Sequence, residues 1–187
     1  MLEEAYKEGK LRAIGVSNFY PDHFIDIASN MEIVPAVNQV ETHVFDQQTE
    51  PQRIMEEFGT HIMSWAPFAE GRNDFFTNPI LAEIGNKYDK SIAQVALRWL
   101  IQRGIIVIPK STHIERMQQN IDIFDFVLSD EDMAAITMLD TGRSLFFDHH
   151  DAETARMFMG WRENYKPLLT KTQCKKIEAT GKLWSTG

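Results

Sequence analysis

The chain has 187 residues, of which 43% are hydrophobic and 25% are charged, values that fit one globular domain with a substantial core. Its formal net charge of −8 and the lack of a long basic run argue against non-specific binding to nucleic acid or to an anionic membrane. The single cysteine, Cys174, excludes an intrachain disulfide framework and fits a reducing, cytoplasmic compartment. No apolar run approaches the ~18 residues that a membrane span requires, and the charged first residues do not resemble a signal peptide.

Short apolar segments alternate with segments of helical periodicity along the chain. After a helical segment over residues 1–9, the expected strands comprise residues 13–16, 35–40, 61–66 and 105–108. These strands are apolar on both faces, as is typical of parallel strands that helices bury. The alternation predicts a parallel α/β fold.

Capping signals predict where several of the helices begin. They are Asn78-Pro79, Ser91-x-x-Gln94, Thr112-x-x-Glu115 and Ser129-x-x-Asp132. The third of them predicts a helix that begins just after Thr112, directly behind the last strand. A further signal, Thr49-x-x-Gln52 with Pro51, predicts the start of the helix after the strand over residues 35–40. A further short helix is expected over residues 151–160, after a loop over residues 140–150.

The start of the helix expected after Thr112 carries basic and hydroxyl side chains. Lys110 and Arg116 flank that end, and Ser111 and Thr112 add hydroxyl groups. The first turn of a helix exposes unpaired N–H groups and the positive end of the macrodipole, so such a site suits a phosphate group. Taken alone, the pattern also fits a capped surface helix with two solvated cations.

Polar and aromatic residues follow the predicted strands. In parallel α/β folds, chemistry gathers at the C-terminal ends of the strands. The residues at these ends are Ser17, Asn18, Asn38, Gln39, Trp65, Lys110 and Ser111. We therefore expect amide groups, hydroxyl groups, a large aromatic ring and a phosphate site along one rim.

Three longer motifs carry these residues. They are Gly9-Lys10-Leu11-Arg12-Ala13-Ile14-Gly15-Val16-Ser17-Asn18-Phe19, Asn38-Gln39-Val40-Glu41-x-His43 and Ile108-Pro109-Lys110-Ser111-Thr112-x-x-x-Arg116-x-x-x-Asn120. In their order and separation they resemble the aldo-keto reductase family, most closely bacterial members of the 2,5-diketo-gluconate reductase type. The resemblance runs from residue 1 to about residue 162. It implies a (β/α)₈ TIM barrel that uses NADP(H), of which this chain supplies about the second half: four βα units plus a C-terminal helix and loop.

The resemblance implies that one group of residues holds the nicotinamide. Ser17, Asn18 and Gln39 match positions that hydrogen-bond the carboxamide, for which hydroxyl and amide groups supply both donors and acceptors. Trp65 matches the aromatic residue that stacks on the nicotinamide ring, where the family usually has Tyr; an indole ring stacks at least as well.

A second group is implied to hold the adenosine end of the cofactor. Lys110, Ser111, Thr112 and Arg116 match the 2′-phosphate clamp that favours NADPH over NADH. Asn120 matches a position that contacts the adenine. Gln119 stands where many members have Glu, and its amide keeps a contact of that type possible. Ala66 and Phe68 stand where the family often has Ser and Leu, in a region expected near the pyrophosphate. The implied substrate-pocket loop contains Phe146 and Phe147.

The family's catalytic Asp, Tyr, Lys and His belong to the first half of the barrel, and no tyrosine of this chain lies in a matching motif. We therefore predict no catalytic residue in the chain. The expected division is residues 1–145 as the C-terminal half of the barrel, residues 146–162 as the substrate-loop region, and residues 163–187 as an unplaced tail. The implied activity is NADPH-dependent reduction of small aldehydes, ketones or keto sugars by hydride transfer. The alternative is a non-catalytic half-barrel remnant that binds nucleotide weakly or only forms an assembly.

A half barrel would leave two sheet edges and an apolar face uncovered. Three explanations follow: a fragment of a longer reductase, which we favour; a half barrel that self-associates; or one that pairs with a separate first half. The expected ligand is a small-molecule carbonyl compound. His43 is expected to be structural, and the pair His149-His150 is expected to lie in a loop, with no metal site.

Overall fold

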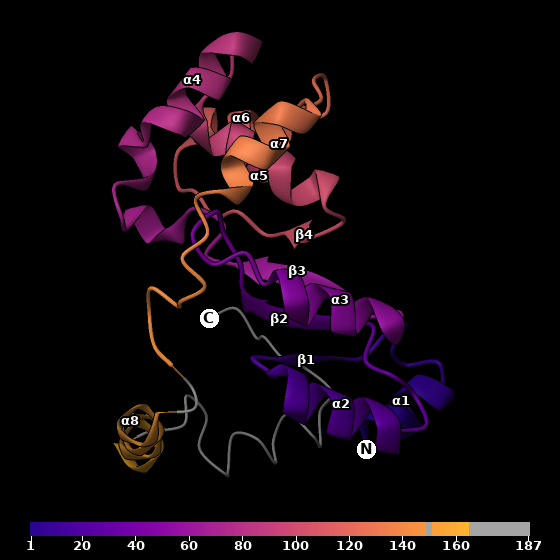
Figure 1. Ribbon diagram of the computed structural model, residues 1–187. Helices are drawn as coiled ribbons and strands as arrows, with labels where there is room; N and C mark the ends of the chain where they lie inside the picture. Colours follow the sequence, from indigo (N-terminus) through magenta and orange to yellow (C-terminus); the bar gives the residue numbers. More distant parts are fainter. Residues whose placement is uncertain (149–150, 165–187) are drawn as a thin grey trace, which may run out of the picture. The chain divides into compact units, whose positions relative to one another are not determined.

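The computed structural model describes residues 1–148 and 151–164 (Figure 1). Two compact units are present, one over Met1–Leu145 and one that begins at Phe146. The second unit contains helix α8 (Ala152–Asn164). The segment expected as an unplaced tail, residues 163–187, lies outside the described residues except for the last two positions of this helix.

One parallel sheet organises the first unit. Its described strands are β1 (Gly15–Ser17), β2 (Val37–Glu41), β3 (His61–Trp65) and β4 (Ile106–Val107). They are hydrogen-bonded in the order β1-β2-β3-β4, and every pairing is parallel. This confirms the predicted α/β fold as part of a barrel. The strands begin one or two residues later than expected at three of the four positions.

Of the described helices of the first unit, one precedes β1 and the others lie between or after the strands. They are α1 (Leu2–Lys7), α2 (Pro21–Asn30), α3 (Thr49–Glu57), α4 (Pro79–Tyr88), α5 (Ile92–Gln102), α6 (Ile114–Ile121) and α7 (Asp130–Thr137), with short 3₁₀ turns η1 (Ala69–Gly71) and η2 (Phe75–Thr77). Figure 1 shows α1 to α3 beside β1 and β2, and α4 to α7 gathered beyond β4.

Three of the predicted capping signals are confirmed, whereas Thr49-x-x-Gln52 is not, because Gln48 is the N-cap of α3 and no side chain caps that helix. The Asn78 side chain accepts from the N–H groups of Ile80 and Leu81 at the start of α4. Capping boxes open α5 and α7, with Ser91 and Ser129 as the N-cap residues. Each box satisfies donors that would otherwise lack a partner, and therefore fixes where the helix begins.

The prediction for the helix after Thr112 was wrong by one residue. Helix α6 begins at Ile114, with His113 as its N-cap and no side-chain cap. The Ser111 hydroxyl accepts from the His113 N–H at 3.0 Å. This local turn occupies the segment where Thr112 would have served as the cap, because a serine side chain bonds readily to the backbone two residues further on.

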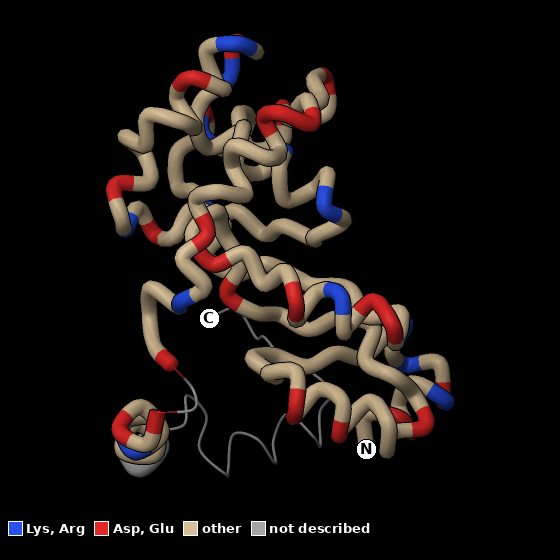
Figure 2. Tube along the Cα trace, in the orientation of Figure 1, with Lys and Arg blue, Asp and Glu red and all other residues tan. Residues whose placement is uncertain are grey.

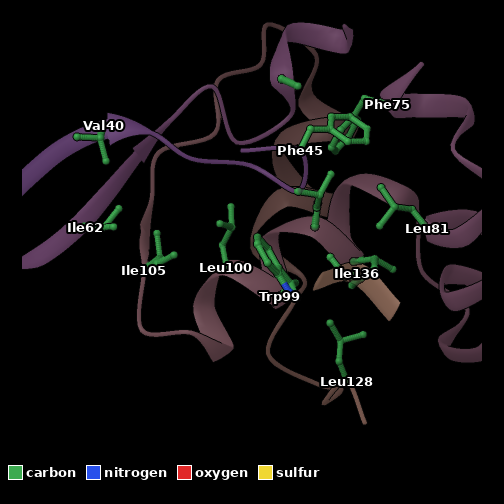
Figure 3. Close-up of a cluster of buried hydrophobic side chains, with 14 of the residues drawn as sticks. Val40, Phe45, Ile62, Phe75, Leu81, Trp99, Leu100, Ile105, Leu128 and Ile136 are labelled. Carbon is green, nitrogen blue, oxygen red and sulfur yellow. The ribbon is translucent and has the colours of Figure 1, made fainter. Parts of the chain in front are cut away.

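The core lies between the sheet and helices α4, α5 and α7. Trp99 of α5 is fully buried, and Figure 3 shows it beside Leu100, with Ile136 of α7 and Leu128 close by. Phe45 and Phe75 close the other side of this cluster, with ring centroids 6.3 Å apart in an edge-to-face arrangement. Such close packing fixes α5, and therefore the side chains at its N-terminus, against the sheet.

The two faces of the sheet differ in exposure. Val40 and Ile62 are buried against the helices, whereas Ser17, His61 and Ile106 on the opposite face are exposed. Gly15 permits the close approach of β1 to β2, because a Cβ there would lie 2.5 Å from Val37 Cγ2. Within the first unit, β1 and β4 are edge strands, each paired on one side only.

Among the described residues, acidic and basic positions are interspersed along the chain. Figure 2 shows Asp and Glu spread over α1 to α3 and at the start of α7, with Lys and Arg scattered between them. Among residues 1–148 and 151–164, every helix is too short or too polar to cross a bilayer.

Candidate functional site

Four of the predicted site residues lie together, at the end of β1, in the middle of β2 and at the end of β3; we call them the amide cluster: Ser17, Asn18, Gln39 and Trp65. The register pairs Ser17 with Gln39. The backbone carbonyl of Gln39 accepts from the Ser17 hydroxyl at 3.0 Å and from the Asn18 N–H at 2.9 Å. The end of β1 is thereby held against the middle of β2.

Asn18 and Trp65 are fixed against each other. The Trp65 indole N–H donates to Asn18 Oδ1 at 2.9 Å. Asn18 has φ of +57°, a conformation in which asparagine is several-fold enriched among non-glycine residues. The carboxamide of Asn38, fully buried behind the cluster, holds Phe19 on both sides: Nδ2 donates to the Phe19 carbonyl at 2.7 Å, and Oδ1 accepts from the Phe19 N–H at 3.4 Å. The cluster is therefore a preorganised set of hydroxyl, amide and aromatic groups.

A cleft of about 590 Å³ carries the phosphate-site residues. We call it the basic cleft. Its lining comprises Phe68, Phe76, Ser91, Ile92, Ala93, Lys110, Ser111, Arg116, Gln119 and Asn120. Neither Lys110 nor Arg116 forms an ion pair with a carboxylate in the described part of the chain. Two uncompensated cations and a hydroxyl group at one wall of a cleft suit a phosphate, while the phenyl rings suit a planar apolar group.

A buried polar network lies beside the amide cluster. Glu41, the last residue of β2, is 6% exposed, and His43 is fully buried. The His43 Nε2–H donates to Glu41 Oε1 at 2.8 Å, while Nδ1 accepts from the Phe45 and Asp46 N–H groups at 3.2 and 3.1 Å. Because Nδ1 accepts two bonds, the imidazole is neutral and its proton is on Nε2. The structural role expected for His43 agrees with these bonds.

Glu41 and Asp46 respond to this environment in opposite directions. Burial raises the pKa of Glu41, but hydrogen bonds from His43, Ser144 and Leu145 outweigh it and hold the pKa below its ordinary value. Burial, followed by the negative charge of Glu41, raises the pKa of Asp46 to about 6. At neutral pH the protein therefore contains an ionised Asp46 in surroundings that favour its neutral form.

We expect Asp46→Asn to stabilise the protein at pH 7.5 by about 1–3 kcal/mol, since one pKa unit corresponds to ~1.4 kcal/mol. A group whose pKa is raised by folding adds stability at pH values below its unfolded-state pKa, and this stability is lost as the pH rises through its folded-state pKa. For Asp46, the free energy of unfolding of the wild type should therefore fall between about pH 4 and pH 6. Urea unfolding at pH 4 and pH 7.5 measures this. An equal effect of the substitution at both pH values would contradict the assignment.

The family model for the aldo/keto reductase family matches residues 1–141. The chain belongs to the aldo-keto reductase family. Glyoxal reductase of Bacillus subtilis is 45% identical over 138 residues, which cover 74% of this chain and 49% of that enzyme. Among solved structures, the aldo-keto reductase MGS-M4 from a Medee basin deep-sea metagenome library is 42% identical, with a TM-score of 0.78 over 81% of this chain and 56% of that one.

An aldo-keto reductase of Bombyx mori, solved in complex with NADP, is also similar. It is 36% identical, with a TM-score of 0.72, and the match covers 81% of this chain and 52% of that protein. The chain thus spans about half the length of the relatives it matches.

The aldo-keto reductase fold gathers the predicted site residues into two groups. Ser17, Asn18, Gln39 and Trp65 form the amide cluster, and five further predicted residues line the basic cleft. Thr112 is exposed and is absent from the lining, so the structure does not bring it to the cleft with Lys110 and Ser111. Binding of a cofactor by these residues remains a prediction.

Several lining residues were not singled out from the sequence. Phe76 belongs to the 3₁₀ turn η2, while Ser91, Ile92 and Ala93 form the start of α5. The capping signal at Ser91 located that helix start but could not show that it faces Arg116. His149 and His150 lie outside the described residues. Among residues that are described, no group of three or more His, Cys, Asp or Glu side chains could hold a metal ion.

Proposed function

We propose that this chain provides the NADP(H)-binding half of a carbonyl reductase. The observation that supports the proposal most is the basic cleft, which Lys110, Ser111 and Arg116 line together with the phenyl rings of Phe68 and Phe76. These residues would hold the adenosine 2′-phosphate, with Gln119 and Asn120 near the adenine. The donor set suits the group: two cations and a hydroxyl match a dianionic phosphate.

The amide cluster would hold the nicotinamide carboxamide through Ser17, Asn18 and Gln39, with Trp65 against the ring. Asn18 is already oriented by its bond with the Trp65 indole N–H, so binding would cost little additional ordering of these side chains. When bound, NADPH would supply a hydride to the carbonyl carbon of a small aldehyde, ketone or keto sugar. Orientation of the nicotinamide face is the contribution that we assign to this chain.

The residue that protonates the carbonyl oxygen would come from a complementary first half of the barrel. Its place is next to β1 and β4, whose outer edges are open in the first unit, and over the face that carries Ser17 and Ile106. We infer that this complement precedes the present chain in a longer reductase. Self-association of two copies is the competing way to cover the same edges. A cytoplasmic location belongs to the same proposal and is supported by the single cysteine.

Turnover assays separate this proposal from a non-catalytic remnant. The purified 187-residue chain should bind 2′,5′-ADP but should not oxidise NADPH with methylglyoxal above background, because we assign the proton donor to the complementary half of the barrel. Co-expression with the first half of the Bacillus subtilis glyoxal reductase should restore NADPH oxidation. Light scattering on the chain alone tests self-association.

Each outcome has a defined consequence. Turnover by the chain alone would overturn the assignment of the proton donor to another segment. If 2′,5′-ADP does not bind to a chain whose circular dichroism shows a folded protein, the NADP(H) proposal fails and the chain is a non-catalytic remnant. A stable dimer that oxidises NADPH would favour self-association over the first-half complement.

A further inference from the structure

The side chain of Glu41 points away from solvent and binds a distant segment. Ser144 Oγ donates to Glu41 Oε2 at 2.5 Å, and the Leu145 N–H donates to Oε1 at 2.9 Å. The Arg72 guanidinium, from the loop after β3, donates to the Leu145 carbonyl oxygen. The Leu145 residue is therefore held through both its N–H and its C=O.

The carboxylate of Glu41 is also held by residues other than Ser144 and Leu145. His43 donates to Oε1, and the backbone N–H groups of Phe45 and Asp46 orient the imidazole. A buried carboxylate with several donors is strongly directional, because each bond to a charged acceptor is worth more than a neutral one.

Two further links run parallel to the Glu41 contacts. The Phe45 carbonyl accepts from the Thr141 N–H at 2.9 Å and from the Thr141 hydroxyl at 2.7 Å. Asp140 Oδ1 accepts from the Gln47 N–H at 3.2 Å. Residues 140–145 are thus tied to residues 41–47 along their whole length, and Glu41 makes the last tie.

The Glu41–Leu145 contact lies near the amide cluster. Glu41 is paired in register with Trp65 and follows Gln39 by two residues, so Leu145 is held at the amide-cluster end of the strands. Leu145 is also the final residue of the first compact unit. The family model stops at residue 141, so Ser144 and Leu145, which donate hydrogen bonds to Glu41, lie beyond it.

We propose that Glu41 is a positioning residue: it clamps Leu145, and so fixes the point from which the C-terminal segment beginning at Phe146 leaves the barrel half. The clamp follows from the geometry of the first unit alone. Its consequence for reduction, namely that the segment starts at the end where the carbonyl substrate would bind, rests on the proposed function.

Hydrogen exchange of the full chain tests the clamp. Glu41→Met, which keeps the size of the side chain but loses the acceptors, should speed exchange of the Leu145 amide about 10- to 100-fold. Glu41→Gln retains an amide oxygen for the Leu145 N–H and should stay within about threefold of wild type. Thr137→Ala is the control, because its hydroxyl bonds only to the Met133 carbonyl on α7 among the contacts of the described residues; it should leave the Leu145 amide unchanged.

Rescue by Gln but not by Met supports a positioning role, whereas a purely space-filling role would let Gln and Met replace Glu41 equally well. Equal exchange of the Leu145 amide in wild type and in Glu41→Met overturns the proposal. If Glu41→Met does not fold, Ser144→Ala replaces it, with an expected acceleration of about three- to tenfold. The 2′,5′-ADP affinity of each folded variant should match wild type; failure of wild type to bind this ligand would remove the proposed function and leave the clamp intact.

Discussion

Arg116→Ala is expected to weaken binding of 2′,5′-ADP about 10- to 50-fold, while binding of 5′-ADP changes less than about twofold. The arginine side chain lines the basic cleft with Lys110 and Ser111 and has no carboxylate partner among the described residues. A charge-assisted hydrogen bond contributes ~1.5–3 kcal/mol, and exposure of Arg116 to solvent places the effect in the lower part of that range. Isothermal titration calorimetry with the two nucleotides measures the difference directly.

A matched control is available on another helix. Arg53 on α3 is exposed as well, but it pairs with Glu50 and Glu57 and lies outside the cleft lining. Arg53→Ala should therefore leave both affinities unchanged. An equal loss of 2′,5′-ADP and 5′-ADP in Arg116→Ala would remove the 2′-phosphate assignment, because only one of the two ligands carries that group.

The fold was predictable because its signals are local. A short apolar strand followed by an amphipathic helix recurs four times, and each unit is specified by residues close together in the chain. The helix start at Ser91 depends on a hydroxyl three residues from its partner, and it was predicted correctly. The helix start predicted after Thr112 was wrong because two neighbouring hydroxyl groups, at Ser111 and Thr112, can bond to the same turn. The sequence did not show that the Ser111 hydroxyl makes this bond.

The site could be predicted only where the pairing of the strands brings its residues together. Ser17 and Gln39 meet because the parallel register pairs the last residue of β1 with the middle residue of β2. The contribution of Phe76 depends on the path of a long loop with several residues at positive φ, among them Asn73 and Asp74, which no periodicity encodes. The contact of Glu41 with Leu145 joins residues 104 positions apart in the sequence, and a single carboxylate at a strand end does not indicate its partner.

Trp99→Ala is expected to have the largest effect on stability, lowering the free energy of unfolding by about 3–5 kcal/mol. The indole ring is fully buried between the sheet and α7 (Figure 3), and the Arg103 guanidinium lies 4.4 Å from its centroid. The substitution removes both the buried ring and this cation–π contact, and leaves a cavity that the packed helices cannot close. Urea unfolding followed by circular dichroism at 222 nm measures the loss without depending on tryptophan fluorescence.

The substitution also links the core to the basic cleft. Trp99 lies two turns after Ile92 and Ala93, which line the cleft, so loss of the ring should loosen the α5 start that faces Arg116. We expect 2′,5′-ADP to bind more weakly to Trp99→Ala even at temperatures where the variant is folded. Phe124→Ala is the control, because that ring is 67% exposed and its removal should cost less than about 1 kcal/mol. Similar unfolding midpoints for the two variants would show that α5 does not anchor the core. An unchanged affinity of Trp99→Ala for 2′,5′-ADP would show that the basic cleft does not depend on the packing of the core.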